Sequence, residues 1–170
     1  KNLRVTVSVS SFVPKPFTPF QWVGQNSQET LFRKQMLLKE AIKNRYVSYN
    51  WHESTLSVLE GVFARGDRKL SEVIELAWRK GCKFDGWSEK FLFDTWMESF
   101  KELQVSPEFY ANRRRDYEEI LPWDHLDFGV SKAFLIKESK KSYEAQTTPH
   151  CRIKCAGCSA NKLNGGKCDV

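Results

Sequence analysis

The sequence predicts an α/β fold with two strand-helix units, followed by an all-helical extension and a small cysteine-rich tail. Residues 5–9 and 46–51 alternate apolar with polar side chains, the spacing typical of strands. The segment after each carries apolar residues at helical spacing, and strands in this order pair in parallel through a right-handed crossover. Four of the five cysteines fall in the last twenty residues. We therefore expect three parts, residues 1–69, 70–146 and 147–170.

The first expected strand is based on Val5, Val7 and Val9, which alternate with small polar residues. It should end near Pro14. The next stretch, residues 14–22, contains three prolines and three aromatic side chains. Proline fixes its own backbone and restricts the residue before it, so this stretch is expected to be a stiff extended loop.

A helix is expected after each of the two strands. Asn26 or Ser27 can cap the first one, because a side-chain oxygen there accepts a free backbone N–H group. The apolar stripe of this helix is formed by Leu31, Leu38, Ala41 and Ile42. The second helix carries Leu56, Leu59 and Phe63 on one stripe and should end near residues 65–66.

Only helices are expected in the extension. One should run from Leu70 to a stop at Gly81, and Ser88 should cap the next. The pair Ser106–Pro107 suits a cap and a first helical turn, and Ser131 should open the last helix. The core of the extension is expected to contain Cys82 and the tryptophans Trp78, Trp87, Trp96 and Trp123.

The composition is that of a packed globular protein, with 41% hydrophobic and 14% aromatic residues. No apolar run approaches the roughly 20 residues of a membrane-spanning helix, and no contact with a membrane is expected. Without a secretory leader or an Asn-x-Ser/Thr acceptor, the sequence predicts a cytoplasmic protein. The chain begins at Lys1 and enters an apolar run at once, which predicts a segment of a longer chain whose upstream part is its partner.

Positive charge is concentrated towards the C-terminus. From residue 130 onward, eight Lys or Arg residues oppose three acidic ones, which gives +5 of the net charge of +6. Such a tail could approach RNA or another anionic partner. Solvated lysines, together with compensation for a doubly negative zinc–thiolate unit, explain the same charge without a partner.

Three closely spaced cysteines, Cys151, Cys155 and Cys158, have the spacing C-x3-C-x2-C. Short loops of this kind allow thiolates to converge on one centre. Cys168, on the far side of a glycine-containing turn, could supply a fourth thiolate. Basic residues around the cluster favour the thiolate, which is the form that binds metal.

Structural zinc and an iron–sulfur cluster both accept four thiolates, so ligand chemistry leaves these two alternatives open. Disulfides or free thiols are a third alternative, disfavoured because nothing places the chain in an oxidising compartment. His150 could replace one thiolate at a zinc site. His52 and His125 stand alone in loops and are expected to make ordinary hydrogen bonds, although each could also act as an acid, a base or a ligand.

Five motifs follow one another along the chain: Phe12–Trp22, Leu59–Arg68, Phe84–Trp87, Leu121–His125 and the cysteine tail. In this order they resemble the C-terminal part of radical S-adenosylmethionine (radical SAM) iron–sulfur proteins that carry an N-terminal cobalamin-binding-type domain. The resemblance covers almost all of the 170 residues. It implies that residues 1–69 are the last βα units of a partial radical-SAM-type barrel, followed by the helical extension and the metal-type tail.

The resemblance implies that the parent protein is an enzyme. Its catalytic 4Fe–4S cluster motif, its S-adenosylmethionine site and any cobalamin site would lie upstream, so this segment is not catalytic alone. Loops after barrel strands line the reaction chamber. The candidates to line it are Lys15, Thr18, Gln21 and Trp22, unless the loop simply packs its own aromatic rings. Arg65 and Asp67 could bind a carboxylate or phosphate of the substrate, or form an ion pair.

The tail differs from the catalytic motif of the family, and it also departs from the tail that the resemblance implies. The same cysteine spacing holds the catalytic cluster of radical SAM enzymes, but there it lies early in the barrel and has an aromatic residue where this chain has Gly157. A further cysteine expected soon after Cys158 is also missing, since residues 159–161 are Ser-Ala-Asn. We therefore expect an auxiliary iron–sulfur cluster or a structural zinc. The alternative function is a zinc-stabilised basic module that contacts RNA or protein.

Overall fold

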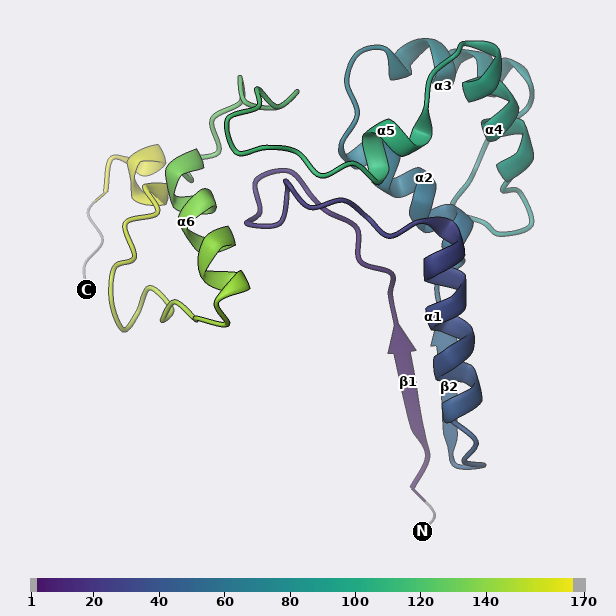
Figure 1. Cartoon of the computed structure of the whole chain (residues 1–170), viewed down its shortest axis with the longest axis horizontal. Coiled ribbons are helices and arrows are strands. Elements are labelled where there is room, and N and C mark those ends of the chain that lie inside the picture. The colour runs from purple at the N-terminus through teal and green to yellow at the C-terminus, as the bar shows by residue number, and fades with distance from the viewer. Residues whose placement is uncertain (1–2, 167–170) are drawn as a thin grey trace. The chain divides into compact units, whose positions relative to one another are not determined.

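The structure is a computed structural model that describes residues 3–166. Its elements are, in chain order, β1 (Val5–Val9), α1 (Gln28–Ala41), β2 (Val47–Trp51), α2 (Ser54–Ala64), α3 (Leu70–Arg79), α4 (Phe93–Glu102), α5 (Pro107–Ala111), α6 (Lys132–Tyr143) and a 3-10 helix (Ala160–Asn164) (Figure 1).

The described chain forms two compact units. Unit 1 contains the residues up to 13 and residues 24–113, and unit 2 contains residues 14–23 and those from 114 onward. The boundaries expected after residues 69 and 146 therefore fall inside these units. The loop at residues 14–23 belongs with the C-terminal part of the chain, a grouping that the linear sequence does not indicate.

Unit 1 begins with the predicted parallel strand pair. β1 and β2 run in parallel with Val5 opposite Val47 and Val9 opposite Trp51, and α1 connects the two strands. The expected extension of the first strand to Pro14 is wrong. β1 ends at Val9 because its last partner, Trp51, is the last residue of β2 before the chain turns into α2.

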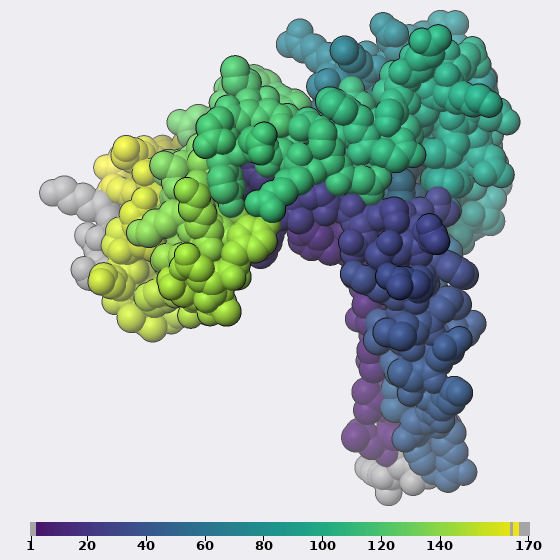
Figure 2. Space-filling model, in the orientation of Figure 1, coloured from purple at the N-terminus to yellow at the C-terminus, as the bar shows by residue number. Residues whose placement is uncertain are grey.

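The two faces of this sheet differ in polarity. The apolar face lies against α1, where Gln35 Nε2 donates to the carbonyl of His52 at 2.7 Å and Lys39 Nζ lies 5.5 Å from the Trp51 ring centroid. The opposite face carries Thr6, Ser8, Ser48 and Asn50, all of them exposed. In the space-filling view, β1 (purple) runs along the margin of unit 1 with no further described chain pairing with its free edge (Figure 2).

Side-chain capping fixes the start of three helices as predicted. The hydroxyl oxygen of Ser27 accepts the Thr30 N–H at the start of α1, and Ser106 accepts the Phe109 N–H at the start of α5. Ser131 accepts the Phe134 N–H at the start of α6. Each hydroxyl satisfies a backbone donor that has no partner within its helix.

The core of unit 1 is formed by α2 to α5. Its fully buried members include Val62 of α2, Val73 and Ala77 of α3 and Phe100 of α4. Cys82 is buried there as predicted, 4% exposed. Burial and the nearby charge of Asp85 raise the pKa of its thiol, so Cys82 stays neutral and packs as a small apolar group.

The expectation that four tryptophans lie in the core is wrong for two of them. Trp78 and Trp87 are 56% and 60% exposed. In α3 the buried stripe runs through Leu70, Val73 and Ala77, whereas Trp78 lies one turn after Ile74 on a neighbouring row that faces outward. Trp96 is buried in unit 1, and Trp123 is buried in unit 2.

The cap expected at Ser88 is also wrong. α4 begins at Phe93 with Leu92 before it, and no side-chain hydrogen bond caps it. Ser88 lies in consecutive turns, in which its carbonyl accepts the Phe91 N–H and the Trp87 carbonyl accepts the Lys90 N–H. These turns use the backbone that an earlier helix start would need.

Unit 2 has a small core of its own. Trp22, Leu121, Trp123 and Leu135 are buried there, with Tyr117 packed edge-on to Trp22 at a ring-centroid distance of 5.0 Å. The core thus joins the loop at residues 14–23 to α6 and to the segment before it. Among residues 3–166, no helix combines the length and the apolar composition needed to cross a bilayer.

Candidate functional site

The loop at residues 14–23 is folded into turns and is not the extended segment that its prolines suggest. The Gln21 N–H donates to the Thr18 carbonyl at 3.1 Å, and the Thr18 hydroxyl donates to the Lys15 carbonyl at 2.8 Å. Phe17 has a left-handed backbone conformation with φ 59°. This conformation lets the Phe17 N–H donate to Gln21 Oε1 at 3.0 Å, so the side chain of Gln21 closes the loop.

The four residues predicted to line a chamber have different positions in this loop. Lys15 is exposed, and Thr18 is half-buried with its hydroxyl bonded to the loop itself. Trp22 is 2% exposed and belongs to the core of unit 2. Gln21 is the member of this set that lines a cavity.

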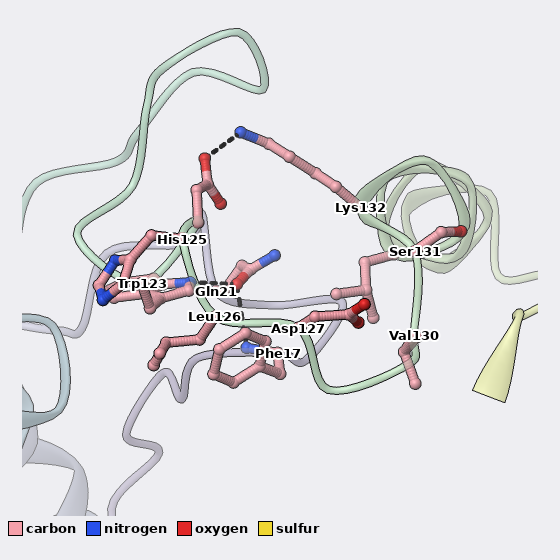
Figure 3. Close-up of a pocket in the computed structure, with 11 residues that line it drawn as sticks. Phe17, Gln21, Trp123, His125, Leu126, Asp127, Val130, Ser131 and Lys132 are labelled. Carbon is pink, nitrogen blue, oxygen red and sulfur yellow. Dashed lines mark hydrogen bonds and ion pairs between the residues drawn. The ribbon is translucent and has the colours of Figure 1, made fainter. Parts of the chain in front are cut away.

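The cavity has a volume of about 340 Å³ and lies wholly within unit 2 (Figure 3). Residues from the loop at 14–23 meet residues from the segment before α6 and from its first turns. The lining consists of Phe17, Gln21, Trp123, Asp124, His125, Leu126, Asp127, Val130, Ser131, Lys132 and Leu135. It combines apolar walls with several polar groups, as small-molecule sites commonly do.

Gln21 provides the most buried polar group of the cavity, since its side chain is 2% exposed. Its Oε1 accepts two N–H groups, from Phe17 at 3.0 Å and from Trp123 Nε1 at 2.7 Å. Because both partners are donors, they hold the oxygen and leave the amide nitrogen on the opposite side, where Figure 3 shows it directed into the cavity. A hydrogen-bond donor is thereby held in place for a ligand oxygen or ring nitrogen.

The acidic residues of the cavity are held by short-range contacts. Asp124 Oδ2 accepts the Leu121 N–H at 2.9 Å and pairs with Lys132 Nζ at 2.6 Å, and Lys132 also donates to the Glu119 carbonyl. Asp127 Oδ1 accepts the Gly129 N–H at 2.7 Å, with Gly129 in a left-handed conformation at φ 78°. The Asp124–Lys132 pair is neutral, so Asp127 gives the cavity its excess negative charge.

His125 is the one of the two loop histidines that reaches this cavity. It is exposed and lies between the two acidic residues in the chain. An imidazole beside a carboxylate can transfer a proton to or from a bound ligand. His52 follows β2 in unit 1, where its carbonyl accepts from Gln35.

Sequence reasoning did not identify Asp127 and Lys132 as site residues. The sequence signal of Asp127 is its place two residues before Gly129, since an aspartate side chain commonly accepts a backbone N–H two residues further on. The proximity of Asp127 and Lys132 to Gln21 is a long-range contact, since Gln21 and Trp123 are separated by 102 positions. No local pattern encodes such a contact.

The structure gives Arg65 and Asp67 supporting roles in unit 1. Arg65 is fully buried, and its two terminal nitrogens donate to the carbonyls of Ala111 and Arg113 at 2.6 and 2.7 Å. Asp67 Oδ1 accepts the Tyr110 hydroxyl and the Lys69 N–H, each at 2.9 Å. These bonds link the residues after α2 to residues 110–113, and they occupy both terminal nitrogens with which Arg65 would bind a substrate anion.

The cysteine tail is anchored to the start of α6. The Ser131 N–H donates to the carbonyl of Cys158 at 3.0 Å, and Leu163 packs against Gly129, whose missing side chain leaves the room for it. Upstream of the cysteines, Thr148 donates to Glu138 of α6 at 2.8 Å. This bond and, to a lesser extent, Lys141 lower the pKa of the Glu138 carboxyl group.

The three described cysteines of the tail are free thiols. Cys151 and Cys155 are exposed and Cys158 is half-buried. Within residues 3–166, no three His, Cys, Asp or Glu side chains are brought together as a metal site. Cys168, the predicted fourth ligand, lies outside the described residues, and His150 is exposed. Metal binding by the tail stays a prediction.

We expect the described cysteines to differ sharply in reactivity towards iodoacetamide at pH 8. Cys151, Cys155 and Cys158 are accessible and should be alkylated within minutes, whereas buried Cys82, with its raised pKa, should react at least about tenfold more slowly. Mass spectrometry of timed digests of metal-free protein measures the four rates. Equal rates for Cys82 and Cys155 would contradict the burial of Cys82.

Comparison of the chain with models of protein families, with curated proteins and with solved structures finds no match.

Proposed function

We propose that this chain is the C-terminal segment of a radical SAM iron–sulfur enzyme and that its cysteine tail binds an auxiliary metal centre. The order of the five motifs and the parallel strand-helix-strand unit support this proposal. In the parent enzyme, a catalytic 4Fe–4S cluster and S-adenosylmethionine would supply radical chemistry, and cobalamin would belong to the N-terminal domain. The residues of this segment would bind and shield the substrate.

The strand pair of unit 1 supports a place in a barrel. In a βα barrel the helices lie outside the strands and the opposite strand faces point inward. α1 covers the apolar face, which leaves the polar residues Thr6, Ser8, Ser48 and Asn50 for the interior. Within the described chain the sheet has two strands, and parallel sheets are normally larger, so we propose that upstream strands continue it.

The cavity of unit 2 supports a role in substrate binding. Gln21, one of the residues predicted to line the chamber, offers its amide N–H to a ligand acceptor. Asp127 and His125 offer a carboxylate and an imidazole from the opposite segment. Arg65 and Asp67 have no part in this proposal, because their polar groups are bonded within unit 1.

The observation that carries the metal proposal is the arrangement of the tail. Three free thiols occur within eight residues of irregular backbone, with turns at residues 151–153 and left-handed conformations at Gly157 and Ser159. Gly157 has no atom near the position of a missing Cβ, so the loop has room to fold around an ion. Thiolates suit both zinc and iron–sulfur clusters, and the test has to distinguish them.

The test is the iron and zinc content of protein purified without oxygen, together with its visible spectrum. The variants are Cys151→Ser, Cys155→Ser, Cys158→Ser and Cys168→Ser, with Cys82→Ala as a control cysteine outside the tail. Bound iron with absorption near ~400 nm, lost in the tail variants and kept in the control, would support an auxiliary cluster. Stoichiometric zinc in a colourless protein would support a structural site and favour the basic module that contacts RNA or protein. Metal-free native protein, or unchanged metal content in all four tail variants, would refute the proposal.

A further inference from the structure

A second hollow of the molecule lies in unit 1 and takes no part in the proposed function. It has a volume of about 610 Å³ and lies beside α3, α4 and the loop after α3. Its lining consists of Phe63, Ile74, Trp78, Cys82, Lys83, Phe84, Asp85 and Trp96. Cys82 and Trp96 form a buried floor, and Trp78 and Phe84 form an exposed rim. We call it the aromatic groove.

The rim of the aromatic groove exposes more apolar surface than the fold requires. Ile74, Trp78 and Phe84 are 46%, 56% and 70% exposed, although they lie within eleven residues of one another. Phe84 also has a left-handed backbone conformation with φ 59°, which is unfavourable for a bulky residue. Exposed rings held in this way contribute little to stability, and clustered apolar residues of this kind mark interaction sites.

The groove also contains a buried carboxylate oxygen without a bonded partner in the described part of the chain. Asp85 Oδ1 is buried, and neither oxygen of this carboxylate has a hydrogen-bond or ion-pair partner in the described part of the chain. A buried carboxylate oxygen is unfavourable unless a cation or a donor pairs with it. Asp85 Oδ1 therefore offers an acceptor to a positively charged donor that enters the groove.

Lys83 shows that the rim can accept a cation. Its Nζ lies 5.5 Å from the centroid of the Trp78 ring, at cation–π distance, and it makes no ion pair with Asp85. A guanidinium group could use both features at once, because it is planar, stacks on aromatic rings and binds a carboxylate with two N–H groups. The hollow is also large and open enough for the residues on either side of such a group.

We infer that the aromatic groove binds an arginine side chain of a partner protein, stacked on Trp78 and Phe84 and paired with Asp85. In the bound state Lys83 leaves the Trp78 ring. The inference does not depend on the radical SAM proposal, since none of the tail cysteines or cavity residues contributes to it.

The probe is the peptide acetyl-Leu-Arg-Leu-amide, titrated into the full chain and followed by NMR of the Trp78 indole N–H. A Trp78→Phe variant assigns this signal by its loss. The neutral comparison is the same peptide with citrulline, which keeps the shape of arginine and lacks its charge. We expect saturable binding of the arginine peptide and at least about tenfold weaker binding of the citrulline peptide.

Two groove variants and one control make the test specific. Asp85→Asn keeps the shape of the side chain and should weaken binding of the arginine peptide at least about tenfold. Lys83→Met removes the competing cation and should strengthen binding about twofold to threefold. Asp94→Asn, on the exposed surface of α4 outside the groove, should leave the affinity unchanged.

Three outcomes would overturn the inference. These are equal binding of the two peptides, unchanged binding by Asp85→Asn, and no saturable binding at the solubility limit of the arginine peptide. Far-UV circular dichroism and thermal unfolding of each variant verify that the fold is intact. Lys83 is exposed, so Lys83→Met is the groove variant least expected to disturb the fold.

Discussion

An Arg65→Met variant is expected to unfold at a lower urea concentration, with its free energy of unfolding reduced by about 3 kcal/mol. Arg65 is fully buried and donates to the carbonyls of Ala111 and Arg113. The Ala111 carbonyl also accepts the N–H of Gln25, so three segments of unit 1 meet at this point. Methionine fills much of the volume but donates no hydrogen bond, so both carbonyls lose the guanidinium donor and the Ala111 carbonyl keeps the Gln25 N–H.

The control for this variant is Arg68→Met, three residues further along the chain. Arg68 is exposed, so the same change in side chain should alter the free energy of unfolding by less than about 0.5 kcal/mol. Urea titrations followed by tryptophan fluorescence measure both variants. Equal stability of the two variants would show that the buried guanidinium does not hold the end of α5.

Arg65 also shows a limit of sequence reasoning. In sequence it stands next to a glycine and an aspartate after a helix, and charged residues in such a place are normally on the surface. Both sequence interpretations, a substrate anion or an ion pair, follow from this expectation. The carbonyls that accept its hydrogen bonds belong to residues 46 and 48 positions away. Every residue has a backbone carbonyl, so the sequence does not indicate which ones will accept.

The local elements of the fold were predictable because their signals lie within a few residues. The alternating valines predicted β1, because strand periodicity lies within one strand. Ser27, Ser106 and Ser131 predicted three helix starts, because a capping side chain acts within one helical turn. The helix start predicted at Ser88 was wrong because turns before α4 use the backbone groups that such a start would need. The outward position of Trp78 was missed because hydrophobicity alone does not tell which row of a helix meets a partner.

The candidate site was predictable only in part, for the same reason. The motifs at residues 12–22 and 121–125 each point to a special role, and Gln21 was among the residues predicted to line a chamber. What joins them is the hydrogen bond from Trp123 Nε1 to Gln21 Oε1, which fixes the amide nitrogen towards the cavity. The two residues are 102 positions apart in the sequence, so only the structure shows this contact. The same holds for the grouping of residues 14–23 with the C-terminal unit.

A Gly24→Ala variant is expected to lose about 3 kcal/mol of stability, or to fail to fold, because one methyl group would meet backbone. A Cβ at this position would lie 2.0 Å from the carbonyl oxygen of Asn112 and 2.8 Å from its carbonyl carbon. The two segments are held together there by the Gln25 N–H to Ala111 carbonyl bond at 2.8 Å and by Asn112 Nδ2, which donates to the Gln25 carbonyl at 3.0 Å. Neither backbone segment can move away without breaking these bonds.

The matched control for Gly24→Ala is Gly86→Ala, where a Cβ would meet no atom within 4 Å. The same methyl group should there change the free energy of unfolding by less than about 1 kcal/mol, and reduced freedom of the unfolded chain could make the change favourable. Thermal unfolding followed by circular dichroism compares the two variants. If both melted at the native temperature, the segments at residues 24–25 and 111–113 could not be packed as closely as the structure has them, and the hydrogen bonds from Arg65 to the neighbouring carbonyls of Ala111 and Arg113 would be in doubt as well.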